Sequence, residues 1–217
     1  MIEGHFIVLE GIDGSGTTSQ ASLLKKRFTE RGLAAHATQE PSGGPVGALI
    51  RQILTGRVVS QRTQPTTQPS WKTMALLFAA DRQDHLEAEV LPNIREGVTV
   101  ICDRYVYSSI IYQSLSTEYA DAEPWIRELN RFAPTPDLVL YLQVSPDEAF
   151  RRRLSRDRKA ELFEDPDFQV VLAEAYDNMS QNYPDTRIVP IDGTQSIDAV
   201  TDACWHEIEV LRSLGAP

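Results

Sequence analysis

The stretch Phe6-Ile-Val-Leu-Glu-Gly-Ile-Asp-Gly-Ser-Gly-Thr-Thr-Ser19 decides the fold of this chain. An apolar run over 5–9 predicts a buried strand, glycines follow at positions 11, 14 and 16, and a helical pattern starts directly after them. This is the layout of a phosphate-binding P-loop, G-x-x-x-x-G-K-[ST], in which glycine-permitted turns direct backbone N–H groups at phosphate oxygens. Thr18 stands where the hydroxyl that binds Mg²⁺ belongs, but Thr17 occupies the position of the lysine.

A glycine-rich turn between a strand and a helix can also be no more than a tight connection. Here the strand, the glycine spacing, Thr18 and the helix all agree, which favours phosphate binding even without the lysine. The loop amides and the helix N-terminus supply positive potential independently of any side chain. We therefore expect a nucleotide site over 11–18, formed by Gly11, Ile12, Asp13, Gly14, Ser15, Gly16, Thr17 and Thr18.

Length, charge and cysteine content limit the class of protein. The chain has 217 residues and a net charge of −10. We expect one domain over 1–217 and no nucleic acid or anionic membrane as partner, because both need a basic surface. Cys102 and Cys204 lie too far apart for a disulfide framework or metal-cluster spacing and are expected to be buried thiols. No stretch approaches the ~20 apolar residues that cross a bilayer. The N-terminus also lacks a signal-peptide pattern, so we expect a cytoplasmic protein.

Short apolar runs alternate with helical patterns along the chain. Alternation of this kind predicts an α/β fold, a three-layer α/β/α arrangement of the P-loop NTPase type around a five-stranded parallel sheet. Ligands of such sheets bind at the carboxyl ends of the strands. The expected strands are His5–Glu10, Ala34–Gln39, Val98–Asp103, Leu138–Gln143 and Arg187–Ile191. The expected helices are Ser19–Arg31, Val46–Leu54, Trp71–Arg95, Ser108–Ser114, Glu123–Phe132, Pro146–Arg156, Pro166–Asn182 and Ser196–Leu214.

One segment, Gln61–Ser70, carries two prolines among Thr, Ser and Gln and is expected to be an exposed loop. A connector is the simpler interpretation, and a functional lid is the alternative, because long loops serve either purpose.

A second signal is the run Val98-Thr-Val-Ile-Cys-Asp-Arg-Tyr105, which predicts a buried strand ending in Asp103 and Arg104. A carboxylate at the tip of a strand beside a P-loop is suited to holding Mg²⁺ through its water shell. The adjacent guanidinium can neutralise phosphate bidentately. Alone, the Asp-Arg pair is equally typical of a structural salt bridge, but beside a P-loop the functional interpretation is favoured.

Phe78 and Arg82 lie four residues apart in the long helical pattern and therefore share a helix face. A ring and a guanidinium on one face are able to stack on a nucleobase and donate to its carbonyl. From spacing alone, a core phenylalanine and a surface ion pair between Arg82 and Asp81 or Asp84 are favoured instead.

The run Arg151-Arg-Arg-Leu-Ser-Arg-Asp-Arg-Lys159 places six cations within nine residues of an acidic protein. Part of this run is the solvated face of a helix. Arg156, Arg158 and Lys159 follow the helix, and we expect a small basic lid over about 151–165 that closes on a triphosphate and stabilises the charge of the transferring group.

Together these residues resemble the thymidylate (dTMP) kinase family over nearly the whole chain. The resemblance is carried by Glu10-Gly-Ile-Asp-Gly-Ser-Gly16, Glu40-Pro41, Leu77-Phe-Ala-Ala-Asp-Arg82, Asp103-Arg-Tyr-x-x-Ser-Ser-x-x-Tyr-Gln113 and Pro136-Asp-Leu-x-Leu-Tyr-Leu142. It implies phosphorylation of dTMP to dTDP by direct in-line transfer, ATP bound at the P-loop as the donor, Mg²⁺ as the metal, and a homodimer that associates through helices.

The resemblance also implies a binding pocket for dTMP and reverses the interpretation of Phe78 and Arg82. Phe78 would stack on thymine, Arg82 would donate to its O4 atom, and Ser109 would approach its N3 edge. Tyr112 would crowd the 2′ position of the sugar, which favours deoxyribose. Gln113 completes the motif and is expected to bind the substrate as well.

Further roles implied by the resemblance concern phosphate and metal. Asp13 would meet the 3′-hydroxyl and, with Thr18 and Asp103, the metal shell. Arg51 and Arg104 would hold the monophosphate. The catalytic set would be Asp13, Arg104 and the lid residues Arg156 and Arg158, and adenine would pack near 192–195. A general base is not required, because a nucleoside monophosphate has its second pKa near ~6 and is already mostly dianionic.

The chain departs from the family at Thr17. Losing one well-placed charge-stabilising donor commonly costs ~3 kcal/mol, or roughly 10²–10³ in rate. Three interpretations follow from this change. In the first, a lid arginine or Lys159 supplies the missing charge; in the second, the enzyme is slow; in the third, the protein binds nucleotides without transferring phosphate. Retention of Asp13, Thr18, Asp103 and Arg104 favours compensation. Leu162 and Gln143 are weaker departures. A kinase of another deoxynucleotide or of a deoxynucleoside is the remaining alternative.

Overall fold

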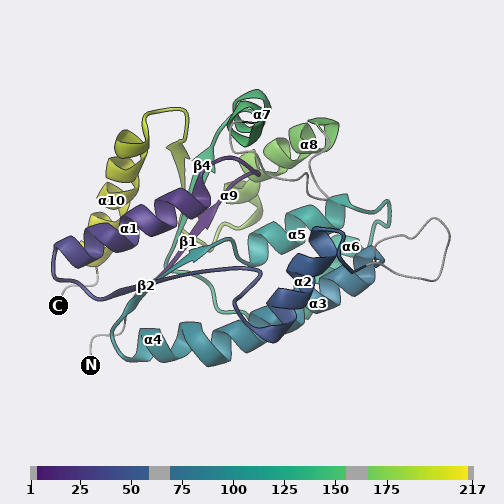
Figure 1. The fold of residues 1–217 in the computed structure, drawn as a ribbon, viewed down its shortest axis with the longest axis horizontal. Helices are drawn as coiled ribbons and strands as arrows, with labels where there is room; N and C mark the ends of the chain where they lie inside the picture. The colour runs from purple at the N-terminus through teal and green to yellow at the C-terminus, as the bar shows by residue number, and fades with distance from the viewer. Residues whose placement is uncertain (1–3, 59–68, 155–165, 215–217) are drawn as a thin grey trace.

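A five-stranded sheet forms the centre of the molecule (Figure 1). The computed structural model describes residues 4–58, 69–154 and 166–214. The strands are β1 (Phe6–Glu10), β2 (Ala35–Gln39), β3 (Thr99–Asp103), β4 (Leu138–Gln143) and β5 (Ile188–Asp192). They run in the order β2-β3-β1-β4-β5, and every neighbouring pair is parallel. Each predicted strand is present within one residue at either end.

Helices connect the strands and cover both faces of the sheet, which confirms the predicted α/β class with a P-loop NTPase-like arrangement. They are α1 (Thr17–Glu30), α2 (Pro45–Leu54), α3 (Trp71–His85), the π-helical η1 (Leu86–Val90), α4 (Leu91–Arg95), α5 (Val106–Leu115), α6 (Ala122–Leu129), α7 (Pro146–Leu154), α8 (Pro166–Asp177), α9 (Met179–Asn182) and α10 (Ile197–Leu214). Within the described ranges, none of these helices has the length and apolar character needed to span a membrane.

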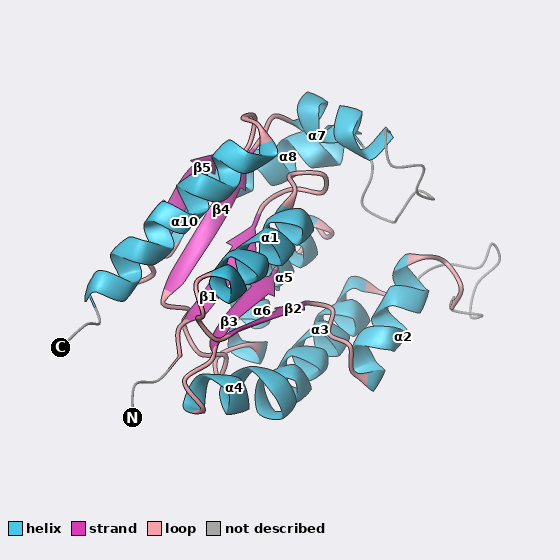
Figure 2. Ribbon diagram, turned by 60° about the vertical axis from the view of Figure 1, so that its left-hand side comes forward, coloured by secondary structure: helices cyan, strands magenta, loops and turns pink. Residues whose placement is uncertain are grey.

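The sheet separates two apolar cores. On one face α1 and α10 lie side by side, as Figures 1 and 2 show, and Phe28 meets Trp205 edge to face with ring centroids 4.9 Å apart. On the other face η1, α5 and α8 pack against the sheet through Leu86, Ile111 and Leu172. Because the central strands β1, β3 and β4 are buried on both faces, their sequences read as nearly continuous apolar runs.

The long helix predicted over 71–95 is interrupted by a π-helical turn, which the sequence analysis did not predict. The backbone N–H of Leu91 bonds to the carbonyl of Leu86, five residues back. Pro92 follows and has no N–H to give to the helix, so the regular ladder is broken at this point. The predicted helix over 166–182 is likewise divided into α8 and α9 at Asn178.

Two predicted segments fall largely outside the described residues. Of the loop Gln61–Ser70, only Pro69 and Ser70 are described, and Ser70 caps α3 by accepting a hydrogen bond from the N–H of Thr73 at 3.3 Å. Of the lid over about 151–165, only the end of α7 is described.

The topology brings the ends of three strands to one edge of the sheet. Asp103, the last residue of β3, is in register with Leu9 of β1 and with Gln39 of β2. The P-loop therefore starts beside the carboxyl ends of β2 and β3, where parallel sheets bind their ligands. The candidate site is built at this edge.

Both cysteine thiols are buried, and we expect them to be unreactive in the folded protein. Burial raises the pKa of Cys102 well above its usual value and that of Cys204 to about 12. Since the thiolate is the reactive form, 5,5′-dithiobis(2-nitrobenzoate) at pH 8 should detect almost no thiol in the native protein and two per chain after denaturation. Rapid titration of either thiol in the native state would contradict this packing.

Candidate active site

The loop between β1 and α1 has the backbone geometry of a phosphate cradle. Gly11, Gly14 and Gly16 have φ angles of 157°, 96° and 103°, and helix α1 begins at Thr17. At Gly14 and Gly16 these angles lie in the left-handed region, which side chains other than glycine rarely adopt. The loop therefore leads directly into the helix N-terminus, where unpaired N–H groups and the helix dipole favour an anion.

Helix α7 lies directly against this loop. A Cβ atom at Gly14 would come within 2.5 Å of the carbonyl oxygen of Ala149, so only glycine permits the approach. One turn further along α7, Arg153 donates from Nη1 to the carbonyl oxygen of Asp13. Arg152 donates to the carbonyl of Gly193 at 2.8 Å and to that of Ser15, in the P-loop, at 3.4 Å. The expected lid helix thus starts in contact with the P-loop.

Thr18 and Asp103 are two of the three residues predicted to contact the metal. The hydroxyl of Thr18 donates to Oδ2 of Asp103. The second carboxylate oxygen, Oδ1, is buried and has no hydrogen-bond partner among the described residues. An orphaned carboxylate oxygen beside a threonine hydroxyl fits Mg²⁺, which is bound by one or two protein oxygens together with phosphates and water.

Arg104 lies at the junction of β3 and α5 and is held by four partners. Its Nη2 donates to Oδ1 of Asp13 at 2.7 Å, and its Nη1 donates to the carbonyl of Gly11 at 2.9 Å. Ser108 and Tyr176 complete the set at 3.0 and 3.3 Å from Nη1. Its φ of 69° makes it the single non-glycine residue with positive φ in the described ranges. Such a conformation costs on the order of 1–3 kcal/mol and is typical of functional sites.

Glu10 lies beneath Arg104 and is fully buried. It accepts hydrogen bonds from the hydroxyl of Ser108 at 2.6 Å and from that of Tyr176 at 3.0 Å. Burial raises the pKa of Glu10, while the charge of Arg104 and the hydrogen bond from Ser108 act in the opposite direction. The same two hydroxyls contact Arg104, so Glu10 supports the position of the guanidinium.

Arg82 is buried, with 2% of its surface exposed, and its partners come from three separate segments. Nε and Nη2 both contact Oε2 of Glu40, at 2.9 and 2.6 Å. Nη2 also donates to the hydroxyl of Ser109 at 2.7 Å, and Nη1 donates to Oδ1 of Asn130. The surface ion pair with Asp81 or Asp84 that helical spacing favoured is therefore wrong. Asp81 instead accepts hydrogen bonds from the N–H and hydroxyl of Ser42, at 2.7 and 2.6 Å.

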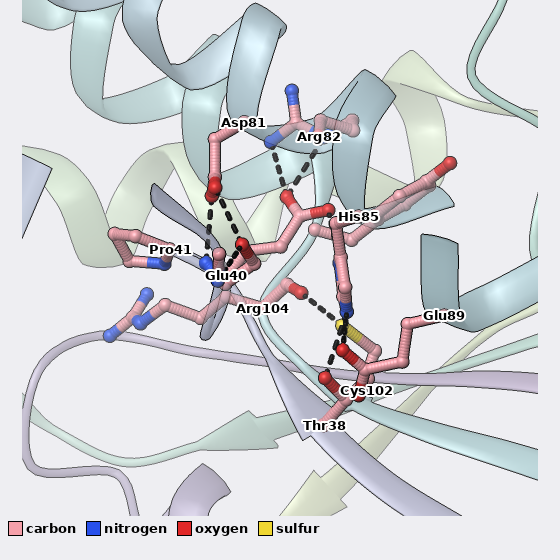
Figure 3. Close-up of polar contacts among 12 residues, drawn as sticks. Thr38, Glu40, Pro41, Asp81, Arg82, His85, Glu89, Cys102 and Arg104 are labelled. Atoms are coloured by element: carbon pink, nitrogen blue, oxygen red, sulfur yellow. Dashed lines mark hydrogen bonds and ion pairs between the residues drawn. The ribbon is translucent and has the colours of Figure 1, made fainter. Parts of the chain in front are cut away.

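Glu40 is itself held on both sides, and Figure 3 shows it lying between Arg82 and His85. Nδ1 of His85 lies 3.4 Å from Oε1 of Glu40, and Nε2 of His85 contacts the hydroxyl of Thr38 at 2.8 Å. Glu89, in the π-helical turn, lies 3.7 Å from the same Nε2. Hydrogen bonds from Thr38 through His85 to Glu40 thus join the end of β2 to the end of α3, and they fix the carboxylate of Glu40 that contacts Arg82.

A single cavity of about 1270 Å³ connects these groups. Gly14, Thr17 and Thr18 line it at one end, and Phe78 and Arg82 line it at the other, with Arg104 in the same wall. Phe78 is half-buried and packs beside Ile50 and Met74, with part of its side chain lining the cavity. Since a pocket for one small molecule measures about 300–1,000 Å³, this cavity has room for two ligands.

Comparison with known proteins agrees with a site for two nucleotides. The family model described as thymidylate kinase matches residues 9–204. The chain belongs to the thymidylate kinase family. It is 39% identical over 188 residues to a probable thymidylate kinase of Pyrococcus horikoshii, covering 87% of this chain and 88% of that one. It is 35% identical over 216 residues to a putative thymidylate kinase of Treponema pallidum, covering 97% of each.

The predicted resemblance is confirmed, and with it the class of reaction. As a thymidylate kinase, the protein is a nucleoside monophosphate kinase that uses ATP to phosphorylate dTMP to dTDP. The roles of individual residues were predicted from the resemblance and stay predictions.

The structure brings most of the predicted site residues of this thymidylate kinase to one cavity. Asp13 accepts hydrogen bonds from Arg104 at 2.7 Å and from the hydroxyl of Tyr112 at 3.1 Å. Its carboxylate is therefore paired with these two residues and not with Thr18 and Asp103. Arg51 donates to the carbonyls of Pro41 and Ser42 at 2.8 and 2.6 Å. The predicted lid residues Arg156, Arg158 and Lys159, and Leu162, lie outside the described residues.

Several residues that shape the site were not predicted. They are Ser108, Asn130, Gln169 and Tyr176; Arg153 was noted only as part of the basic run over 151–159, and Glu40 only as part of a motif. Ser108 stands within the quoted Asp-Arg-Tyr motif, so that motif was an available signal for it. The sequence positions of Asn130 and Tyr176 carry no such signal, because their partners lie 48 and 72 residues away.

Proposed function

We propose that the cavity holds ATP on the P-loop and dTMP between Phe78 and Arg82, and that phosphate passes directly between them. The observation that carries this proposal is the continuity of the cavity, which has the P-loop at one end, a half-buried ring beside a buried guanidinium at the other, and Arg104 in the wall they share. Direct in-line transfer needs the two phosphates to approach each other while their charge is offset.

The donor side is proposed to be the P-loop with Thr18 and Asp103. The amides at the start of α1 face phosphate oxygens, and the orphaned Oδ1 of Asp103 and the hydroxyl of Thr18 are suited to holding Mg²⁺, directly or through water. When bound, Mg²⁺ supplies positive charge to the phosphates of ATP. Asp13, with its oxygens turned to Arg104 and Tyr112, is proposed to orient Arg104 and to meet the sugar.

The dTMP end of the cavity is proposed to recognise the edge of thymine by one hydrogen-bond donor, from Arg82, and one hydrogen-bond acceptor, from Gln113. Of the five N–H groups of Arg82, four contact Glu40, Asn130 and Ser109, which leaves one on Nη1 for a carbonyl such as O4. Gln113 lies one turn beyond Ser109 on α5, and its Oε1 is buried and without a hydrogen-bond partner among the described residues. That oxygen is suited to the N3–H of thymine, which cytosine lacks.

Replacing Gln113 by leucine is expected to raise the KM for dTMP about 10- to 100-fold with little change in kcat, because a buried N3–H would lose its acceptor. The discrimination between dTMP and dCMP should fall by a similar factor. Initial rates at varied dTMP and dCMP concentrations measure both effects. Gln181→Leu, on the exposed surface of α9, is the matched control and should behave as the wild type. Unchanged KM values in the Gln113 variant would remove this residue from the base pocket.

The phosphate of dTMP is proposed to contact Arg51 and Arg104. Both guanidinium groups line the cavity between the base pocket and the P-loop, and both are held by fixed partners. Because the acceptor phosphate is already mostly dianionic at neutral pH, the site needs cations and orientation rather than a general base. Two guanidinium groups favour an acceptor that carries a phosphate over a free deoxynucleoside.

We further propose that the protein acts in the cytoplasm on small molecules and associates as a homodimer. The net charge of −10 disfavours nucleic acid and anionic membranes as partners. Leu49 on α2 and Leu76 on α3 are 39% and 51% exposed on neighbouring helices, and they support a contact between two chains at this surface. Light scattering after size-exclusion chromatography of the wild type and of Leu76→Glu tests the dimer.

Release of ADP from MgATP, with dTMP, dUMP, dCMP, dGMP and thymidine offered separately, tests the proposed function. Turnover selective for dTMP supports it. Selective turnover of another acceptor would favour a different deoxynucleotide kinase. Saturable binding of dTMP without turnover of any acceptor would identify a nucleotide-binding relative that has lost catalysis.

A further inference from the structure

We infer that Arg153, on α7, supplies to the phosphates of ATP the positive charge that a P-loop lysine supplies elsewhere and that Thr17 does not. This inference rests on the proposed function, since it assumes that ATP lies on the P-loop. The lysine of a P-loop reaches the β- and γ-phosphates, where charge develops during transfer. Thr17 lines the same cavity, but its side chain is neutral and supplies no positive charge to these phosphates.

The packing of α7 places Arg153 at the mouth of the P-loop. The approach of Ala149 to Gly14 seats the helix on the loop, at a separation that no side chain at position 14 would allow. Arg153 lies four residues after Ala149 and therefore projects from the same face of the helix. Its Nη1 donates to the carbonyl of Asp13, and the residue lines the cavity beside Gly14 and Thr17. The position of the guanidinium is thus set by a rigid element rather than by a loop.

The charge of Arg153 is available to a ligand. Its neighbours Arg151 and Arg152 both pair with Glu148, at 2.8 and 2.7 Å. Arg153 has no carboxylate partner among the described residues and donates only to neutral oxygens, the carbonyl of Asp13 and Oε1 of Gln169, the latter at 3.5 Å. A half-buried, unneutralised guanidinium directed at a phosphate cradle is what stabilises a transferring phosphoryl group.

Arg104, by contrast, cannot serve both ends of the reaction. Its Nη2 is paired with the carboxylate of Asp13 at 2.7 Å, and its Nη1 donates to Gly11, Ser108 and Tyr176. The P-loop therefore lies between two guanidinium groups, one paired with a carboxylate on the acceptor side and one, on α7, without a carboxylate partner among the described residues. The second is the one that matches the missing lysine.

The deciding experiment exchanges the two positions. Arg153→Met is expected to lower kcat about 10²–10³-fold. Thr17→Lys alone should change kcat by less than about tenfold, whereas Thr17→Lys with Arg153→Met should recover at least tenfold over Arg153→Met. Arg153→Lys, which keeps the charge, should retain more activity than Arg153→Met. Arg151→Met, which is exposed and paired with Glu148 on the same helix, is the matched control and should retain the wild-type rate.

Nucleotide binding gives a second readout that does not depend on turnover. Calorimetry in the absence of dTMP should show that Arg153→Met weakens binding of ATP much more than binding of AMP, because only the outer phosphates lose a partner. A purely structural role would weaken binding of ATP, AMP and dTMP alike and would lower the melting temperature, and that outcome overturns the inference. Full activity of Arg153→Met, or failure of Thr17→Lys to restore the double variant, also overturns it.

The same design separates this inference from the proposed function. Suppose that the wild type turns over dTMP and that Thr17→Lys rescues Arg158→Met or Lys159→Met but does not rescue Arg153→Met. The proposed function then holds, and the assignment to Arg153 is wrong. If the wild type does not turn over any acceptor, the proposed function fails, and the difference between ATP and AMP binding still decides whether Arg153 contacts the phosphates.

Discussion

Replacing Arg104 by methionine is expected to lower kcat with MgATP and dTMP by about 10²–10³-fold, which corresponds to roughly 3–4 kcal/mol in the activation barrier. Arg104 is held by Asp13, Gly11, Ser108 and Tyr176 before any substrate binds, so its charge is in place when the two phosphates approach. Methionine keeps the length of the side chain but removes the charge. Steady-state initial rates over a matrix of ATP and dTMP concentrations measure the effect.

Two further variants make the result specific to the guanidinium. Arg104→Lys should recover only part of the rate, because a single ammonium group cannot contact both a fixed P-loop carbonyl and a phosphate as a planar fork does. Arg127→Met, on the surface of α6 where Arg127 pairs with Glu123 at 2.7 Å, is the control and should have the wild-type rate. An Arg104→Met enzyme within threefold of wild-type kcat would show that Arg104 is structural only.

Replacing Arg82 by methionine is expected to destabilise the fold by about 3–5 kcal/mol and to abolish measurable saturation by dTMP. The loss of stability follows because the carboxylate of Glu40, which is 7% exposed, would stay buried without its cation. The loss of binding follows from the proposed contact between Nη1 and the base, which methionine cannot make. Urea unfolding measures the free energy of unfolding, and calorimetric titration with dTMP measures the binding.

A double variant separates these two consequences. In Glu40→Gln with Arg82→Met both charges of the pair are removed, so much of the stability should return, while dTMP binding should stay lost. His85 keeps a neutral partner in this variant, because its Nδ1 lies 3.4 Å from the side chain at position 40. Recovery of dTMP affinity together with stability would mean that Arg82 acts only as a structural cation.

The fold could be predicted closely because its signals are local. The central strands are buried on both faces, so Phe6–Glu10 and Leu138–Gln143 stand out as apolar runs between helical patterns. The P-loop was equally visible, since its function requires glycines at fixed spacing before a helix. The end of β3 at Asp103 followed from the change from apolar to charged residues.

The inner site could not be predicted from local patterns, because its contacts join distant segments. Helical spacing pairs Arg82 with Asp81 or Asp84, whereas its carboxylate partner, Glu40, lies 42 residues earlier in the chain. The π-helical turn after His85 and the seat of α7 on Gly14 depend on tertiary packing in the same way. The resemblance to a family predicts that Arg82 binds thymine, whereas the groups that hold Arg82 are seen only in the structure.

The most direct test of the account is a competition experiment with the wild-type enzyme. MgATP is mixed with equal concentrations of dTMP, dUMP, dCMP and dGMP, and mass spectrometry follows the nucleoside diphosphate products over time, which gives the ratios of kcat/KM. We expect dTDP to form at least tenfold faster than any other product, despite threonine at position 17. Equal phosphorylation of several acceptors, or no product while dTMP still binds, would contradict it.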